Sequence, residues 1–350
     1  MDKKGRTYDS LEHRGLFDRM RRAKIRSVLA ILAMTDFAHC IVQEAQFVGA
    51  PTVIESYRGN SDVMHLNPTN TFCLIFHGLG LDNSEEIADA YLPIMRNRCQ
   101  IALVHYSPNG IDGGEIARRL SKYFDEHISN DNPIKIVSFG ESAGGIVHYH
   151  ALKALMGMRS DIDIRAMIND GSPTGSIDTK GPLEGAVVEA GAVLADTPLR
   201  FSISAKPIQY AAEFVSRNTR NSAMNDNDRR RLDIGDIRYV VDETDAQVYL
   251  AVLEAIRDFP ETDQDSSFLQ DTAFYYLRAT DPEKDGNVDV DAAGYNWMKI
   301  IGHAKTIEIP DGGHANPRQA PGYIRIVDDI LQEVIVESYS DRRALSDTSR

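Results

Sequence analysis

The chain has 350 residues, of which 42% are hydrophobic and 26% are charged, so it can hold one large α/β domain or two ordinary domains. Its formal net charge of −14 argues against nucleic acid as a general partner, because phosphate binding needs basic patches. The three cysteines, Cys40, Cys73 and Cys99, are scattered and imply neither a disulfide framework nor a zinc site. We therefore expect buried free thiols in a reducing compartment, which favours the cytoplasm; a membrane-associated or exported protein is the alternative.

Residues 1–45 form a basic and then apolar segment ahead of the first predicted strand. Residues 1–26 hold nine basic and four acidic side chains, and an uncharged apolar run follows at 27–35. This run is too short to span a bilayer, which takes about 20 residues. The pattern favours an amphipathic helix that packs on the domain over contact with a membrane surface through residues 19–43.

Strand and helix patterns alternate from residue 46 to residue 173. Apolar and β-branched runs predict strands at 51–57, 71–76, 101–106, 134–139 and 164–168. Helical spacing predicts helices after Asp82 and Asn83, at 111–128 and at 146–156. Because such alternation requires crossover connections, we expect an α/β fold with a mainly parallel, doubly wound sheet.

Residues 174–268 interrupt this alternation and predict a largely helical insertion. Helical patterns appear near 208–215 and 246–256, with a polar stretch at 217–236 between them. Such an insertion is expected to cover the mouth of the site as a cap or lid.

The sheet pattern resumes at 269–336, the second part of the core. Strands are predicted at 273–279 and 305–309, and a helix at 324–336. An acidic, turn-rich loop follows the first of these strands, and residues 337–350 form a polar tail.

The segment Gly140-Glu141-Ser142-Ala143-Gly144 joins a predicted strand to a predicted helix, with a serine at the apex. A serine hydroxyl is a weak nucleophile, so it must stand clear of its backbone, near a base and near amide donors. The two glycines allow the strand and the helix to approach each other closely at such a turn. This pattern favours a nucleophile elbow over a helix N-cap serine.

Four landmarks together resemble the α/β-hydrolase family. They are His77-Gly78-Leu79-Gly80, the serine segment, Asp285-Gly286-Asn287-Val288 and Gly312-Gly313-His314. The resemblance runs from about residue 52 to 336 and is interrupted by the insertion. The chain order of serine, aspartate and histidine is also the order of that family.

The resemblance implies a catalytic triad. Ser142 would be the nucleophile, and His314 would be the base that takes its proton and later protonates the leaving group. Asp285 stands at the family's usual acid position, where it would orient His314. Asp281, nearer the predicted strand end, and Asp170, after an earlier strand, are the alternatives.

The resemblance also implies an oxyanion hole made by the backbone N–H groups of Ala143 and Leu79. His77 is expected to support its loop rather than to react. His148 and His150 follow the serine on its helix and are expected to be structural.

These residues predict a lipase-like serine esterase that cleaves a carboxylic ester through an acyl-enzyme, on a small or lipid-like acyl substrate. Amidase or peptidase, thioesterase and acyltransferase activities use the same triad and are the alternatives. A non-catalytic binding protein is a further alternative, but no triad residue is missing. No metal site and no cofactor are expected, because neither a metal-ligand cluster nor an early Gly-x-Gly-x-x-Gly is present.

Overall fold

The computed structural model describes ten stretches of the chain. They are residues 52–57, 70–78, 84–107, 110–128, 132–180, 182–195, 246–259, 265–310, 312–315 and 321–337. The predicted segment 1–45, the helical pattern near 208–215 and the polar tail beyond 337 lie outside the described residues.

The core is a seven-stranded sheet with the order β1-β3-β2-β4-β5-β6-β7. Its strands are β1 (Val53–Tyr57), β2 (Thr71–Phe76), β3 (Gln100–His105), β4 (Ile134–Glu141), β5 (Ile162–Asp170), β6 (Ala273–Ala279) and β7 (Lys305–Ile309). Every neighbouring pair is parallel except β1 and β3, which pair antiparallel at the edge. All seven predicted strands are present, and the expected mainly parallel α/β sheet is confirmed.

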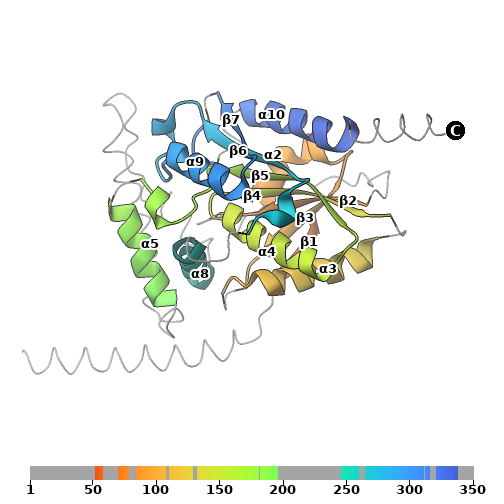
Figure 1. Ribbon diagram of the computed structural model, residues 1–350, viewed down its shortest axis with the longest axis horizontal. Helices are drawn as coiled ribbons and strands as arrows, with labels where there is room; N and C mark the ends of the chain where they lie inside the picture. Colours follow the sequence, from red (N-terminus) through yellow and green to blue (C-terminus); the bar gives the residue numbers. More distant parts are fainter. Residues whose placement is uncertain are drawn as a thin grey trace, which may run out of the picture.

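Helices cover both faces of the sheet (Figure 1), which explains why its central strands are apolar throughout. One face carries α2 (Ser84–Met95) and α10 (Pro321–Leu331), which ends in a π-helical turn, Gln332–Glu337. The other face carries α3 (Gly113–His127), α4 (Gly144–Met158) and α9 (Val290–Ile301). Each layer therefore has its own buried apolar cluster against the sheet.

Helix α9 was not predicted from the sequence, although its signals are local. Asp289 caps its first turn by accepting a hydrogen bond from the Ala292 N–H. Gly302 ends it in the left-handed conformation, with φ 80°. The buried side chain of Trp297 packs the middle of the helix against the core.

Within the predicted insertion, α8 (Ala246–Asp258) lies where a helical pattern was predicted, whereas no pattern had marked α5 (Pro182–Ala195). The two helices pack against each other, and α8 also contacts α4 (Figure 1). Apolar residues of α8, among them Leu250 and Leu253, join the same buried cluster as α4. This part of the insertion is therefore continuous with the core.

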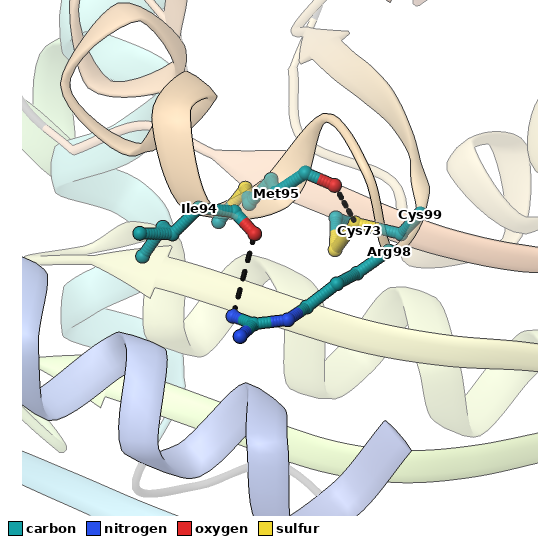
Figure 2. The surroundings of a disulfide bond; sticks show 5 residues. All are labelled: Cys73, Ile94, Met95, Arg98 and Cys99. Carbon is teal, nitrogen blue, oxygen red and sulfur yellow. Dashed lines mark hydrogen bonds between the residues drawn. A yellow bond between two sulfur atoms is a disulfide. The ribbon is translucent and has the colours of Figure 1, made fainter. Parts of the chain in front are cut away.

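A disulfide joins Cys73 on β2 to Cys99 just before β3, so the expectation of free thiols is wrong for this pair (Figure 2). Both cysteines are buried beneath α2, and Cys40 lies outside the described residues. The register pairs Cys73 with Ile101, which brings residue 99 within reach although 26 positions separate the two cysteines. The cytoplasmic expectation rested on free thiols and loses that support.

Next to the disulfide, Arg98 links the α2–β3 connection to helix α10. Its guanidinium donates to the Ile94 carbonyl (Figure 2) and forms an ion pair with Asp328.

Among the described helices, none is both long enough and apolar enough to cross a bilayer.

Candidate active site

Ser142 occupies the turn between β4 and α4, with φ 49°, a conformation that non-glycine residues rarely adopt. The tight turn is possible because the backbones approach each other closely at glycines, which have no side chain. A Cβ on Gly140 would lie 2.5 Å from the Gly145 Cα, and a Cβ on Gly144 would collide with the Phe76 carbonyl. The two glycines of the serine segment therefore let the serine project from a tight elbow.

His314 reaches Ser142 from the loop after β7. Its Nε2 lies 2.9 Å from the Ser142 Oγ, and its Nδ1 lies 2.9 Å from the Asp285 Oδ2. An ionised carboxylate only accepts hydrogen bonds, so Nδ1 carries the hydrogen in this pairing. Nε2 is then left with its lone pair toward the serine hydroxyl.

Asp285 is fully buried, and backbone donors fix its carboxylate. Its Oδ1 accepts hydrogen bonds from the N–H groups of Asn287 (3.0 Å) and Val288 (2.9 Å). Burial alone would raise the pKa of Asp285, but His314 and these two amides outweigh it and hold the pKa below its ordinary value. The structure therefore favours the ionised carboxylate beside His314.

The other two candidate acids lie elsewhere. Asp281 caps the short 3-10 helix η5 (Pro282–Lys284) by accepting from the Glu283 N–H, at an exposed position. Asp170, at the end of β5, is buried among Ile87 and Tyr91 of α2 and Leu277 of β6. The carboxylate that meets His314 is that of Asp285.

The loop that carries Asp285 is held by the first residues of the insertion, which the sequence analysis did not single out. Residues 179 and 288 form a β-bridge, and the Asp289 N–H donates to the Asp178 carbonyl at 2.7 Å. The buried Asp178 carboxylate in turn accepts from the Thr174 N–H (2.7 Å) and from the Asn296 side chain (2.9 Å). These partners are distant in sequence, so no local pattern pointed to them.

Of the two predicted oxyanion donors, Ala143 is described and Leu79 lies outside the described residues. Ala143 is the residue immediately before helix α4, where backbone N–H groups have no intrahelical partner. The His77–Gly78 segment passes directly beside the nucleophile. A Cβ on Gly78 would lie only 2.7 Å from the Ser142 Cβ.

His77 and its neighbour Tyr106 brace this segment. Burial lowers the pKa of His77 to about 4, so its ring is neutral at pH 7. The His77 Nδ1 lies 3.0 Å from the Gly78 carbonyl oxygen, and the ring stacks on that of Tyr106. The Tyr106 hydroxyl donates a hydrogen bond to the His77 carbonyl at 2.8 Å. These contacts fit the expected supporting role of His77.

His148 lies beneath the elbow in a buried polar network. Its Nδ1 is 2.9 Å from the Ser138 Oγ, and its Nε2 is 2.5 Å from the Asn169 Oδ1. The Asn169 oxygen only accepts, so Nε2 donates and Nδ1 accepts from the serine. Burial lowers the pKa of His148 to about 3, which keeps the ring neutral. It links α4 to β4 and β5 and makes no described contact with the triad.

A cavity of about 1000 Å³ lies along α4 on the side of His150 and is not lined by His148. Its lining includes His150 and Lys153 from α4, the first turn of α3 and Glu254 from α8.

Within the stretches that the structure describes, no group of three or more histidine, cysteine, aspartate or glutamate side chains could hold a metal ion.

Comparison with solved structures identifies the fold. MenH from S. aureus matches with a TM-score of 0.50 and 14% identity, over 80% of this chain and 98% of that one. The enol-lactonase from Burkholderia xenovorans matches with 0.50 and 15%, over 80% and 95%. A carboxylesterase structure from Nitrososphaera gargenis matches with 0.50 and 12%, over 81% and 94%. No family model and no curated protein matches the sequence.

The parallel sheet, the helices on both of its faces and these structural neighbours show that the protein has the α/β-hydrolase fold. At 12–15% identity the likeness concerns the fold alone. The activity depends on the side chains that this chain places at the site.

Proposed function

We propose that the protein is a serine hydrolase that cleaves a carboxylic ester through an acyl-enzyme. The observation that carries the proposal is the continuous contact from the Ser142 Oγ through His314 to Asp285, with both distances at 2.9 Å. These are the distances that a nucleophile, a general base and an orienting acid require.

In the proposed first step, His314 Nε2 takes the hydroxyl proton of Ser142 as Oγ bonds to the ester carbonyl carbon. The negative charge then moves to the carbonyl oxygen, where the Ala143 N–H and the start of α4 offer a donor and a partial positive charge. Asp285 stabilises the imidazolium by accepting from Nδ1. The imidazolium gives its proton to the leaving alcohol, and the C–O bond of the ester breaks.

In the proposed second step, water attacks the acyl-enzyme and His314 takes the proton of that water. The tetrahedral intermediate collapses, the proton returns to the Ser142 Oγ and the carboxylic acid leaves. We favour an ester because an alcohol is a better leaving group than an amine. A thioester, an amide or acyl transfer would use the same residues.

A fluorophosphonate probe and a substrate panel test this proposal. The native protein is expected to be labelled at Ser142, and Ser142→Ala and His314→Ala are expected to lose labelling. Matched p-nitrophenyl esters, p-nitroanilides and thioesters with two to twelve acyl carbons, roughly the span from short-chain to lipid-like acids, then compare the bonds. Absent labelling of the native protein would leave a binding protein on this fold, and equal labelling of Ser142→Ala would place the reactive nucleophile at another residue; either result contradicts the proposal. Faster cleavage of anilides than of esters would indicate an amidase instead of an esterase.

A further inference from the structure

Helix α10 contacts the loop that carries His314 through one buried tyrosine. The Tyr323 side chain is fully buried, and its hydroxyl donates to the Gly313 carbonyl at 3.1 Å. Gly313 immediately precedes His314, so this hydrogen bond fixes the backbone from which the imidazole projects.

The same hydroxyl also hydrogen-bonds the carboxyl group of Asp170 at the end of β5. A tyrosine hydroxyl has one hydrogen, and the Gly313 carbonyl can only accept. When Tyr323 donates its one hydrogen to the Gly313 carbonyl, it can only accept from Asp170. Only a protonated Asp170 has a hydrogen to donate.

The surroundings of Asp170 favour that protonated state. Glu141 is its register partner on β4, Tyr91 faces it from α2 and Tyr323 faces it from α10. On the β6 side lie Leu277 and Tyr276, and beyond them Asp285. The loop after β7 brings His314 close, since a Cβ on the adjacent Gly171 would lie 3.2 Å from the histidine Nδ1. Among the described residues, the charges that raise the pKa of Asp170 are those of Glu141 and Asp285.

Burial, and next the charge of Glu141, raise the pKa of Asp170 well above its ordinary value. The Tyr323 hydroxyl, which can donate to the ionised carboxylate, opposes this rise but does not cancel it. Among the described residues the Asp170 Oδ1 has no hydrogen-bond partner, and burial without one is tolerated less well by an ionised oxygen than by a neutral one. Ionisation of Asp170 would reverse the hydrogen bond, because the carboxylate would draw the Tyr323 hydrogen away from Gly313.

We propose that Asp170 is a positioning residue for the base: as a neutral acid it donates to Tyr323, which holds the Gly313 carbonyl and thereby aligns His314 with Ser142. This inference rests on the proposed function of Ser142 and His314. It gives Asp170 a role distinct from that of the triad acid, and it makes neutrality, rather than charge, the property that this position requires.

The test compares Asp170→Asn, Asp170→Ala, Tyr323→Phe and the Asp170→Asn/Tyr323→Phe double variant with the native protein. The asparagine amide is neutral and can still donate to Tyr323, whereas alanine cannot. The readouts are the rate of Ser142 phosphonylation by a fluorophosphonate, and kcat and KM for p-nitrophenyl acetate, from pH 6 to pH 10. Thermal melting of each variant separates folding from positioning.

We expect Asp170→Asn to keep native rates at neutral pH and to equal or exceed them increasingly as the pH rises. Asp170→Ala and Tyr323→Phe should lose roughly 10- to 100-fold in kcat with little change in KM, since misplacement of a reacting group by about 1 Å costs this much. In the Tyr323→Phe background, Asp170→Asn should change nothing.

Two results would overturn the inference: Asp170→Asn as slow as Asp170→Ala, or Tyr323→Phe as fast as the native protein. An advantage of the native protein over Asp170→Asn that grows with pH would also overturn it, because the charged form would then be the active one. If the fluorophosphonate does not label the native protein at all, the proposed function itself has failed, and this result differs from the outcomes above.

Discussion

The Val288 N–H donates to one oxygen of Asp285 at 2.9 Å, and this leaves the other oxygen directed at His314. The carboxylate is therefore oriented by its own loop before the histidine meets it. Because that loop is bridged to the first residues of the insertion, the insertion contributes to the site whether or not it also covers it.

The first prediction separates Asp285 from Asp281. Asp285→Asn should reduce kcat by roughly 10³- to 10⁴-fold, because an amide in place of the carboxylate favours the wrong imidazole tautomer. Asp281→Asn is the matched control, since this residue is exposed and only caps a short helix. Steady-state ester hydrolysis and fluorophosphonate labelling measure both. Equal losses in the two variants would contradict the assignment.

The second prediction concerns Gly171, which follows β5 with φ 56°. A Cβ here would lie 3.2 Å from both the Asp285 Oδ2 and the His314 Nδ1. Gly171→Ala should therefore lower kcat by roughly 10-fold or more, because the pair must separate to admit the methyl group. It should also destabilise the fold by about 1–2 kcal/mol through backbone strain.

Gly302→Ala provides the control for that backbone strain. Gly302 has φ 80°, and a Cβ there would meet nothing within 4 Å. We expect a similar loss of stability in urea denaturation but native kcat. Native activity in Gly171→Ala would show that the aspartate and histidine tolerate displacement, against the prediction.

The third prediction concerns the Cys73–Cys99 disulfide, which closes a loop with a sequence separation of 26 residues. The chain-entropy model gives a stabilisation of about 3.5 kcal/mol for a loop of this size. Cys73→Ser/Cys99→Ser should lose about that free energy of unfolding in urea, and reductant should weaken the native protein but not the variant. Thiol titration of the unfolded, unreduced protein should find one free thiol, and Cys40→Ser should remove it; a count of three would contradict the disulfide.

The fourth prediction follows from the lowered pKa of His148. Its ordinary value of 6.5 falls to about 3 in the folded protein, so between these values the unfolded chain binds a proton that the folded chain does not. Stability is therefore lost as the pH falls below 6.5, by roughly 1.4 kcal/mol per pH unit from this residue.

His148→Gln removes that dependence while keeping one donor and one acceptor. The stability advantage of the native protein over this variant should be constant from pH 7 to 8 and should shrink from pH 6.5 toward pH 4. Urea denaturation at each pH measures it. An advantage that does not change below pH 6.5 would mean that the buried ring is protonated in the fold.

Much of the fold was readable from local patterns. The strands β2, β6 and β7 have the predicted bounds, because each is a short apolar or β-branched run with turn residues at its ends. Helix α9 was not predicted because its first residues continue the acidic loop before it, although Asp289 and Gly302 mark its two ends. The disulfide was missed because scattered spacing says nothing about which strands lie side by side.

The sequence by itself determined the strand–helix alternation, the elbow at Ser142 and the glycine loop at His314, since each depends on residues that are neighbours in the chain. For the acid it favoured Asp285 over Asp281 and Asp170 by resemblance alone, because the sequence does not show which carboxylate contacts the histidine. Only the tertiary structure decided that Asp285, 29 residues before His314, is the carboxylate that meets it. It alone also placed Asp170 against Tyr323, and Cys73 against Cys99, because such contacts depend on strand order and on how the helices pack across the sheet.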